Sequence, residues 1–402
     1  MTTLSNLPAL RSPLPAPQKT IFISTGDVSG DLQGALLVTA LKQLGEKTGI
    51  DLNIVALGGR KMAAAGATIL ADTTGISSIG IWEAIAYIIP TIQVQNIAKE
   101  YLKTTPPDVI VLIDYNAPNA VIGNYAKSVF PDVPIIYYIA PQEWVWSINN
   151  KRTATIVKFT DEILSIFPAE ADYYAERGAK VQFVGHPLID RIATLPSREV
   201  ARAKLGIADD EIAVALIPAS RKQELKYLVP AMFSAAQQIQ AKLPNVRFWI
   251  PLSRDAFKAE LESEIKAHGL NATLVAENAD YAICAADLAI AKSGTVNLEL
   301  ALLSIPQVVI YRFSKVTAWL GRKVFKVEVP FMSPPNLVEM KSIVPELLQE
   351  QATPDRIAAE SLELILNQSR RDRMLADYRQ MQSAVGDPGV CDRVATAIFA
   401  RF

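Results

Sequence analysis

The residue types and spacing near position 295 are those of a nucleoside diphosphate site. Ser293, Gly294 and Thr295 stand between an apolar run and a helical pattern, and the free amides and positive dipole of a helix start attract a diphosphate. Glu299 lies four residues beyond Thr295, on the same helix face and one turn deeper. A carboxylate there can accept both hydroxyls of a ribose. An ordinary helix with Ser293 or Thr295 as N-cap is the competing interpretation, but the combination favours a ligand site.

A second candidate anion site consists of Ser220 and Arg221, which follow another apolar run at 212–217. The guanidinium of Arg221 could bind a phosphate through two parallel hydrogen bonds, with Ser220 and backbone amides in support. A solvated turn that is basic by chance explains the same residues. The loop alone does not decide between these two interpretations.

The segment 24–34 carries three glycines between an apolar run and a helical pattern, and several polar residues stand among them: Gly26, Asp27, Ser29, Gly30, Asp31 and Gly34. The spacing is neither GxGxxG nor GxxxxGK[ST], so the two familiar nucleotide loops do not fit. Glycine allows a ligand to lie against the backbone, but it is also the usual residue of a tight turn. Both interpretations stay open at this point.

Short apolar runs that alternate with helical patterns must position these residues. The helical patterns include 32–44 and 120–127, and the expected strands cover 20–24, 52–57, 109–113, 135–139, 162–166, 181–184, 212–217, 246–250, 272–274, 288–291 and 308–311. Nearly continuous apolar strands bounded by Pro and Gly are typical of parallel sheets covered on both faces. We therefore predict an α/β fold of two doubly wound domains that face each other across a cleft. Ligands of such sheets bind outside the carboxyl ends of the strands.

Three segments divide the chain in this interpretation. Residues 1–19 are polar and proline-rich, which predicts a disordered leader. Residues 20–195 form the first Rossmann-like domain, and residues 196–402 form the second, whose last helices can pack back on the first. The 402 residues carry 40 basic and 41 acidic side chains, so no overall field attracts nucleic acid. Two cysteines, two histidines and the lack of a spanning apolar run predict a reduced, cytoplasmic protein without a multi-His metal site.

The order and number of the motifs resemble those of the lipid-A-disaccharide synthases, a family of GT-B glycosyltransferases. The resemblance runs from Thr20 to about Leu348 and rests on the segments 26–31, 58–62, 113–114, 141–146, 183–187, 218–221, 293–299, 335–337 and 344–349. It implies two facing Rossmann-like domains, the second of which binds the UDP-sugar. It also implies transfer of 2,3-diacylglucosamine from UDP to the 6-hydroxyl of 2,3-diacylglucosamine 1-phosphate, with inversion to a β-1,6 linkage.

The resemblance also suggests roles for individual residues. Asp114, at the end of the apolar run 109–113, becomes the general base, although it could instead cap the next turn together with Asn116. The acceptor side would comprise Gly26, Asp27, Ser29, Gly30, Asp31, Asn119 and His186, and His186 could equally stiffen its Gly-His-Pro turn. The donor side would comprise Ser220, Arg221, Ser293, Gly294, Thr295, Glu299, Asn336, Glu346 and Gln349. No DxD motif is present, so no metal or other cofactor is expected, and Arg221 and the helix start at Ser293 would neutralise the leaving diphosphate.

The acylated substrates that the resemblance implies stay in the bilayer, because each methylene buried there contributes about 0.8 kcal/mol to membrane binding. We therefore predict that the protein associates peripherally with the inner membrane. The dense apolar segment 79–90 could lie at the bilayer surface, with Ile81, Trp82, Tyr87, Ile88 and Ile89 as contacts. A buried core helix is the alternative. The basic and aromatic segment 311–326 is a second candidate, which could also be an ordinary surface helix. A homodimer is compatible with the sequence but not specified by it.

Several positions depart from the family pattern. Asp27 stands where Glu is usual, Ser147 takes the place of an arginine and Ala219 that of a phosphate-loop glycine. Most departures lie in the acceptor half, so UDP binding is better supported than the identity of the acceptor. Another UDP-sugar transferase, a UDP-GlcNAc 2-epimerase and a non-catalytic UDP-sugar or lipid-binding protein are the alternatives.

Overall fold

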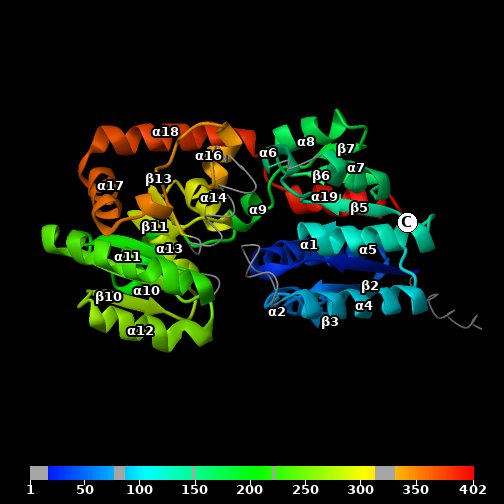
Figure 1. Ribbon diagram of the computed structural model, residues 1–402, viewed down its shortest axis with the longest axis horizontal. Coiled ribbons are helices and arrows are strands. Elements are labelled where there is room, and N and C mark those ends of the chain that lie inside the picture. Colours follow the sequence, from blue (N-terminus) through cyan, green and yellow to red (C-terminus); the bar gives the residue numbers. More distant parts are fainter. Residues whose placement is uncertain (1–16, 77–86, 147–149, 220–221, 313–330) are drawn as a thin grey trace, which may run out of the picture.

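The computed structural model describes residues 17–76, 87–146, 150–219, 222–312 and 331–402, which form two lobes side by side (Figure 1). Each lobe contains one sheet, and the strands of both sheets pair in parallel in the part of the chain that the structure describes. Segments 1–16, 77–86, 147–149, 220–221 and 313–330 lie outside the described residues.

The first sheet has the strand order β3-β2-β1-β4-β5-β6-β7. Its strands are β1 (Gln18–Ser24), β2 (Asp51–Gly58), β3 (Thr68–Asp72), β4 (Val109–Ile113), β5 (Ile135–Tyr138), β6 (Glu162–Ser165) and β7 (Val181–Phe183). The helices that accompany them are α1 (Asp27–Thr48), α2 (Arg60–Ala64), α4 (Ile88–Thr104), α5 (Asn116–Val129), α6 (Glu143–Trp146), α7 (Asn150–Phe159), α8 (Pro168–Ala175) and α9 (Leu188–Ile192).

Strand β4 is buried throughout because helices cover both faces of its sheet. Val111 packs into the apolar cluster that contains Leu37 of α1, whereas its neighbour Ile110 packs into a second cluster with Leu102 of α4 and Ile122 of α5. Side chains alternate across a strand, so a run of five apolar residues supplies both faces at once. This burial makes β4 a rigid support for the residue that follows it.

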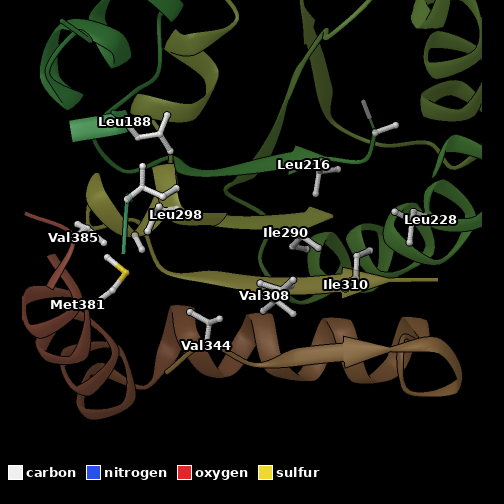
Figure 2. Close-up of a cluster of buried hydrophobic side chains, with 14 of the residues drawn as sticks. Leu188, Leu216, Leu228, Ile290, Leu298, Val308, Ile310, Val344, Met381 and Val385 are labelled. Carbon is white, nitrogen blue, oxygen red and sulfur yellow. The ribbon is translucent and has the colours of Figure 1, made fainter. Parts of the chain in front are cut away.

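The second sheet has the order β10-β9-β8-β11-β12-β13. Its strands are β8 (Ile212–Ile217), β9 (Val246–Pro251), β10 (Ala272–Val275), β11 (Leu288–Lys292), β12 (Gln307–Tyr311) and β13 (Glu346–Leu348). Its helices are α10 (Arg198–Leu205), α11 (Lys222–Lys242), α12 (Lys258–Ala267), α13 (Asp280–Cys284), α14 (Thr295–Leu302), α16 (Pro334–Glu339), α17 (Pro354–Leu366) and α18 (Gln368–Ala384). Figure 2 shows its core, in which Leu216, Ile290 and Val308 come from adjacent strands and Leu228 comes from α11.

The last helix, α19 (Val390–Phe399), lies with the first sheet and packs against α1 (Figure 1). Its first amides, on Gly389, Val390 and Cys391, donate hydrogen bonds to the carboxylate of Asp190 in α9. The guanidinium of Arg393 donates to the carbonyl oxygen of Val184 at 2.9 and 3.0 Å. The chain therefore crosses between the lobes twice.

Two helices begin earlier than the sequence pattern predicts. Helix α1 starts at Asp27 rather than at Leu32, and α5 starts at Asn116 rather than at Ala120. The carboxylate of Asp27 accepts hydrogen bonds from the amides of Ser29 and Gly30, which allows helical backbone without an apolar repeat. Strands β3 and β13 were not expected, since both are short runs at sheet edges. In the described part of the chain, no helix combines the length and the apolar character needed to cross a bilayer.

Candidate active site between the lobes

A cavity of about 80 Å³ opens where the strands of both sheets end. Ser29, Gly30, Asp114 and His186 line it from the first lobe, and Thr295, Leu298 and Pro334 line it from the second. Five of these residues were predicted as site residues from the sequence, two from the loop at 26–31 and one each from three other segments. The carboxyl ends of parallel strands bring them together, as expected for doubly wound sheets.

Asp114 follows β4 directly, and its exposed side chain lies at the cavity. Its backbone is held firmly: its N–H donates to Ile139 O at 3.0 Å, and its carbonyl oxygen accepts from Tyr137 Oη and Asn119 Nδ2, each at 2.8 Å. Asp114 and Tyr115 both adopt positive φ, 45° and 51°. Such backbone costs of order 1–3 kcal/mol per residue and persists only where the surroundings impose it. The turn thus presents the carboxylate from a fixed position.

Asn119 was expected on the acceptor side, and the structure corrects this. The side chain is fully buried, and its Nδ2 donates to the carbonyl oxygens of Ser24, Ile113 and Asp114. Its Oδ1 accepts from Ser24 Oγ at 2.6 Å. All its polar atoms are used within the protein, so Asn119 fixes the turn that carries Asp114 and does not contact a ligand.

The three glycines at the N-cap and in the first turns of α1 lie against other side chains of the protein. A Cβ on Gly26 would lie 2.1 Å from Cδ2 of Tyr115, and one on Gly30 would lie 1.9 Å from Oγ1 of Thr25. A Cβ on Gly34 would lie 2.5 Å from Sδ of Met62. Close packing of protein side chains therefore explains all three glycines, and no ligand is needed to account for them.

The two acidic residues at the start of α1 also have partners within the protein. Asp27 Oδ1 accepts from Ser29 N at 2.8 Å, from Ser29 Oγ at 2.9 Å and from Gly30 N at 2.9 Å. Asp31 is buried and accepts from the amides of Gly59, Lys61 and Met62 at the start of α2. Ser29 and Gly30 reach the cavity, but their amides are engaged by Asp27.

His186 lines the cavity as a neutral ring. Its Nδ1 accepts a hydrogen bond from Leu188 N at 3.2 Å, so the ring proton of the neutral form belongs on Nε2. Burial lowers the pKa of His186 to about 3, and the ring packs against Phe167 with the ring centroids 5.4 Å apart. A ring with so low a pKa can donate a hydrogen bond but is a poor proton acceptor near neutral pH.

The start of α14 matches the prediction only in part. Ser293 is buried, with its N–H donating to Ile310 O and its Oγ to Met332 O. The N–H of Gly294 donates to Oδ1 of Asn297 at 2.8 Å. These two amides are thus not available to a diphosphate, whereas Thr295 lies at the cavity. The positive end of the α14 dipole still faces the space between the lobes.

Glu299 lies one turn below Thr295, as expected, but it is buried and paired with Arg191 of α9. Arg191 Nε donates to Glu299 Oε1 at 3.2 Å, and Arg191 Nη2 lies 2.8 Å from Asp280 Oδ1. Burial raises the pKa of Glu299, and the charge of Arg191 opposes that rise. Sequence reasoning missed Arg191 because it lies 108 positions from Glu299 and belongs to no recognised motif.

Two residues expected at the nucleotide instead hold the loop before β13. Asn336 is fully buried; its Nδ2 donates to Val344 O and to Glu346 Oε1, and its Oδ1 accepts from the amides of Ile343 and Val344. Glu346 also accepts from the amides of Met332 and Ser333. This network uses both side chains internally and corrects their assignment as ligand contacts.

Gln349 remains a predicted contact of the nucleotide. It follows β13 with a φ of 52°, and its Nε2 is buried with no hydrogen-bond partner in the structure as described. A buried amide donor without a partner is costly, and a ligand oxygen would satisfy it. Four other predicted residues, Ser220, Arg221, Ile81 and Trp82, lie outside the described residues.

Glu170 is a residue near the site that no sequence pattern indicated. Its buried carboxylate accepts from the amides of Ala140, Ile166 and Phe167 at 2.9 to 3.3 Å. It thereby ties together the loops after β5 and β6, both of which reach the cavity. Burial raises the pKa of Glu170 to about 8, and the negative charge of Asp114 adds to the rise. Among the described residues, no group of three or more His, Cys, Asp or Glu side chains is placed to hold a metal ion.

Comparison with known proteins decides the family. Residues 21–398 match the family described as lipid-A-disaccharide synthetase. This chain is a member of the lipid-A-disaccharide synthase family. A lipid-A-disaccharide synthase of Gloeothece citriformis is 53% identical over 378 residues, which cover 94% of this chain and 98% of that one. The enzyme of the same name from Myxococcus xanthus is 33% identical over 94% of this chain and 96% of its own.

Solved structures show that this member of the lipid-A-disaccharide synthase family has the GT-B fold. MnaA of S. aureus in complex with UDP superposes with a TM-score of 0.65 at 15% identity, covering 94% of this chain and 96% of its own. MurG of Acinetobacter baumannii gives a TM-score of 0.56 at 14% identity, covering 96% of this chain and 100% of its own. Likeness at such low identity concerns the fold: two facing Rossmann-like lobes with a cleft between them.

Proposed function

We propose that this protein is an inverting glycosyltransferase that joins two acylated glucosamines. It transfers 2,3-diacylglucosamine from UDP to the 6-hydroxyl of 2,3-diacylglucosamine 1-phosphate, forms a β-1,6 linkage and releases UDP. Membership of the synthase family supports this activity. The structural observation that carries it is the cavity lined by Asp114 from one lobe and by Thr295, at the start of α14, from the other.

Asp114 acts as the general base in this mechanism. Its carboxylate takes the proton of the acceptor hydroxyl while the hydroxyl oxygen attacks the anomeric carbon from the face opposite to UDP. The bond from that carbon to the UDP oxygen breaks in the same step, so the configuration inverts. The rigid turn after β4 supports this role, because it holds the carboxylate at the cavity without help from the substrate.

The second lobe stabilises the leaving diphosphate. The positive end of α14 at Thr295 favours negative charge, and Arg221, which follows β8 in the sequence, is the proposed cation. The neutral ring of His186 can donate a hydrogen bond from the first lobe to a substrate oxygen. These groups would act on charge that develops as UDP departs.

A direct test incubates the purified protein with UDP-2,3-diacylglucosamine and 2,3-diacylglucosamine 1-phosphate, and identifies products by mass spectrometry. The proposal requires an acylated disaccharide monophosphate and an equal amount of UDP. A 2-epimerase would change the donor sugar without any acceptor, and a binding protein would release no UDP. The epimerase alternative is disfavoured because a relative named lipid-A-disaccharide synthase is 53% identical to this chain.

We further propose that helix α4 docks the first lobe on the inner-membrane surface. Four isoleucines on this helix expose about half or more of their surface: Ile88 (51%), Ile89 (68%), Ile92 (49%) and Ile97 (46%). Tyr87 precedes them directly. Apolar side chains gathered on one exposed helix favour contact with an apolar phase. The acyl chains of both substrates would be met at that surface.

Replacing both Ile88 and Ile89 with aspartate is expected to weaken binding to anionic phospholipid vesicles by on the order of tenfold or more, since each isoleucine contributes about 1.5–3 kcal/mol when fully buried. Vesicle co-sedimentation measures the effect. The matched control is Leu366→Asp on α17 of the other lobe, where the exposed fraction is 67%, and it should leave vesicle binding unchanged. Equal binding by the double variant and the native protein would exclude α4 as the docking surface.

A further inference from the structure

Arg191 occupies an unusual place in the fold, because it lies on the short helix α9 between the two lobes. Leu188 of α9 packs beside Leu298 of α14 in the core (Figure 2). The carboxylate of Asp190, the residue before Arg191, accepts hydrogen bonds from the first amides of α19. Helix α9 is thus anchored to both lobes, and its backbone holds Arg191 in a defined position.

The guanidinium of Arg191 contacts two carboxylates of the second lobe. Nη2 lies 2.8 Å from Asp280 Oδ1 and 3.1 Å from Glu299 Oε1, and Nε donates to the same Glu299 oxygen at 3.2 Å. The exposed fractions of the side chains are 16% for Arg191 and 8% for Glu299, against 42% for Asp280. Both contacts of Arg191 with Glu299 are made to Oε1, and none is made to Oε2.

We propose that Arg191 is a positioning residue for the UDP-sugar: it fixes the carboxylate of Glu299 so that Oε2 is presented to the ribose hydroxyls. This inference rests on the proposed function, in which Glu299 binds the ribose. A carboxylate offers about four lone-pair positions on two oxygens. Engagement of one oxygen by a rigid guanidinium orients the group and leaves the other oxygen for the ligand.

The charge of Arg191 has a second consequence for ribose binding. Ribose hydroxyls donate their hydrogen bonds, and only the ionised carboxylate has acceptors on both oxygens. Three charged groups on other elements act electrostatically on Glu299: Arg191 on α9, Asp280 on α13 and Lys61 on α2. Burial and Asp280 raise the pKa of Glu299, whereas Arg191 and Lys61 lower it. Arg191 lies in direct contact, so it favours the acceptor form of the buried carboxylate.

The test compares the affinities of UDP and 2′-deoxy-UDP by isothermal titration calorimetry. We expect the native protein to prefer UDP by about tenfold, the effect of one charge-assisted hydrogen bond. In Arg191→Gln this preference should fall to about twofold or less, because the remaining carboxylate is neither oriented nor held ionised. Arg191→Lys keeps the charge but not the planar fork, and should retain an intermediate preference.

A matched control guards against a purely structural effect. Arg202 is a buried arginine of the second lobe; it contacts Asp287 and the carbonyl oxygens of Ala208 and Glu211. Arg202→Gln should lower the melting temperature without changing the ratio of the two affinities. If Arg191→Gln does not fold, Arg191→Lys and the control still provide the comparison.

Other outcomes overturn specific parts of the inference. Failure of the native protein to bind UDP would refute the proposed function itself. Equal affinity of the native protein for UDP and 2′-deoxy-UDP would remove Glu299 from the ribose site. An unchanged ratio in Arg191→Gln, or tighter UDP binding by that variant, would refute the positioning role of Arg191 and leave the proposed function intact.

Discussion

Asp114→Asn lowers kcat for disaccharide formation by about 10²–10⁴-fold, the usual contribution of a general base, while UDP affinity stays unchanged. Asparagine has nearly the shape of aspartate but cannot take the proton of the acceptor hydroxyl. The hydrogen bonds of Asp114 with Ile139, Asn119 and Tyr137 involve its backbone atoms, which the substitution leaves in place. Initial-rate measurements at saturating substrate give kcat, and calorimetry gives the UDP affinity.

The control for this substitution lies at the opposite end of the same strand. Asp108 directly precedes β4 and pairs with Lys19 at 2.8 Å, remote from the strand end that reaches the cavity. Asp108→Asn should leave kcat unchanged. A loss of UDP affinity or of folded protein in Asp114→Asn, in parallel with the loss of rate, would assign Asp114 a structural role instead.

Gly26→Ala should damage both stability and catalysis. The added methyl group would lie 2.1 Å from Cδ2 of Tyr115 and 2.4 Å from its Cε2, so the ring must move. Overpacking of this kind typically costs about 1–3 kcal/mol. Tyr115 adjoins Asp114 and shares its left-handed backbone, so its displacement moves the carboxylate. A shift of about 1 Å at a reacting group can lower the rate by about 10²-fold.

Thermal unfolding and kcat measured on the same preparation check this expectation. Gly75→Ala is the matched control, since a Cβ there meets no atom within 4 Å and the backbone has no positive φ. It should leave both quantities unchanged. Native kcat and melting temperature in Gly26→Ala would show that Tyr115 moves freely, and that its ring does not fix the turn.

The structure shows how the turn that carries Asp114 is supported from several directions. Asn119 and Tyr137 both donate hydrogen bonds to the carbonyl oxygen of Asp114. Glu170 ties the two adjacent loops by their amides. These residues have no part in the chemistry proposed, but each fixes backbone at the cavity. A base at a strand end needs such support, because a fixed backbone holds its side chain in the productive geometry.

Much of the fold could be predicted from the sequence. Five consecutive apolar residues at Val109–Ile113 indicate a strand buried on both faces, and the structure confirms it. Repetition of such runs predicted two parallel sheets, and the position of Asp114 just after a buried strand placed it at the ligand-binding edge. These features depend on local hydrophobic pattern and on chain direction, which a sequence displays directly.

Tertiary structure alone decided which polar residues face the cavity. Asp31, Asn119, Asn336 and Glu346 have the same side chains as ligand-binding residues, yet each satisfies buried backbone amides or carbonyls. The pairing of Arg191 with Glu299 joins positions 108 residues apart. A polar side chain near a strand end serves a ligand or a buried peptide group equally well, because the hydrogen-bonding chemistry is the same. Which of the two it serves depends on the distant segment that packs against it, and local sequence does not encode that neighbour.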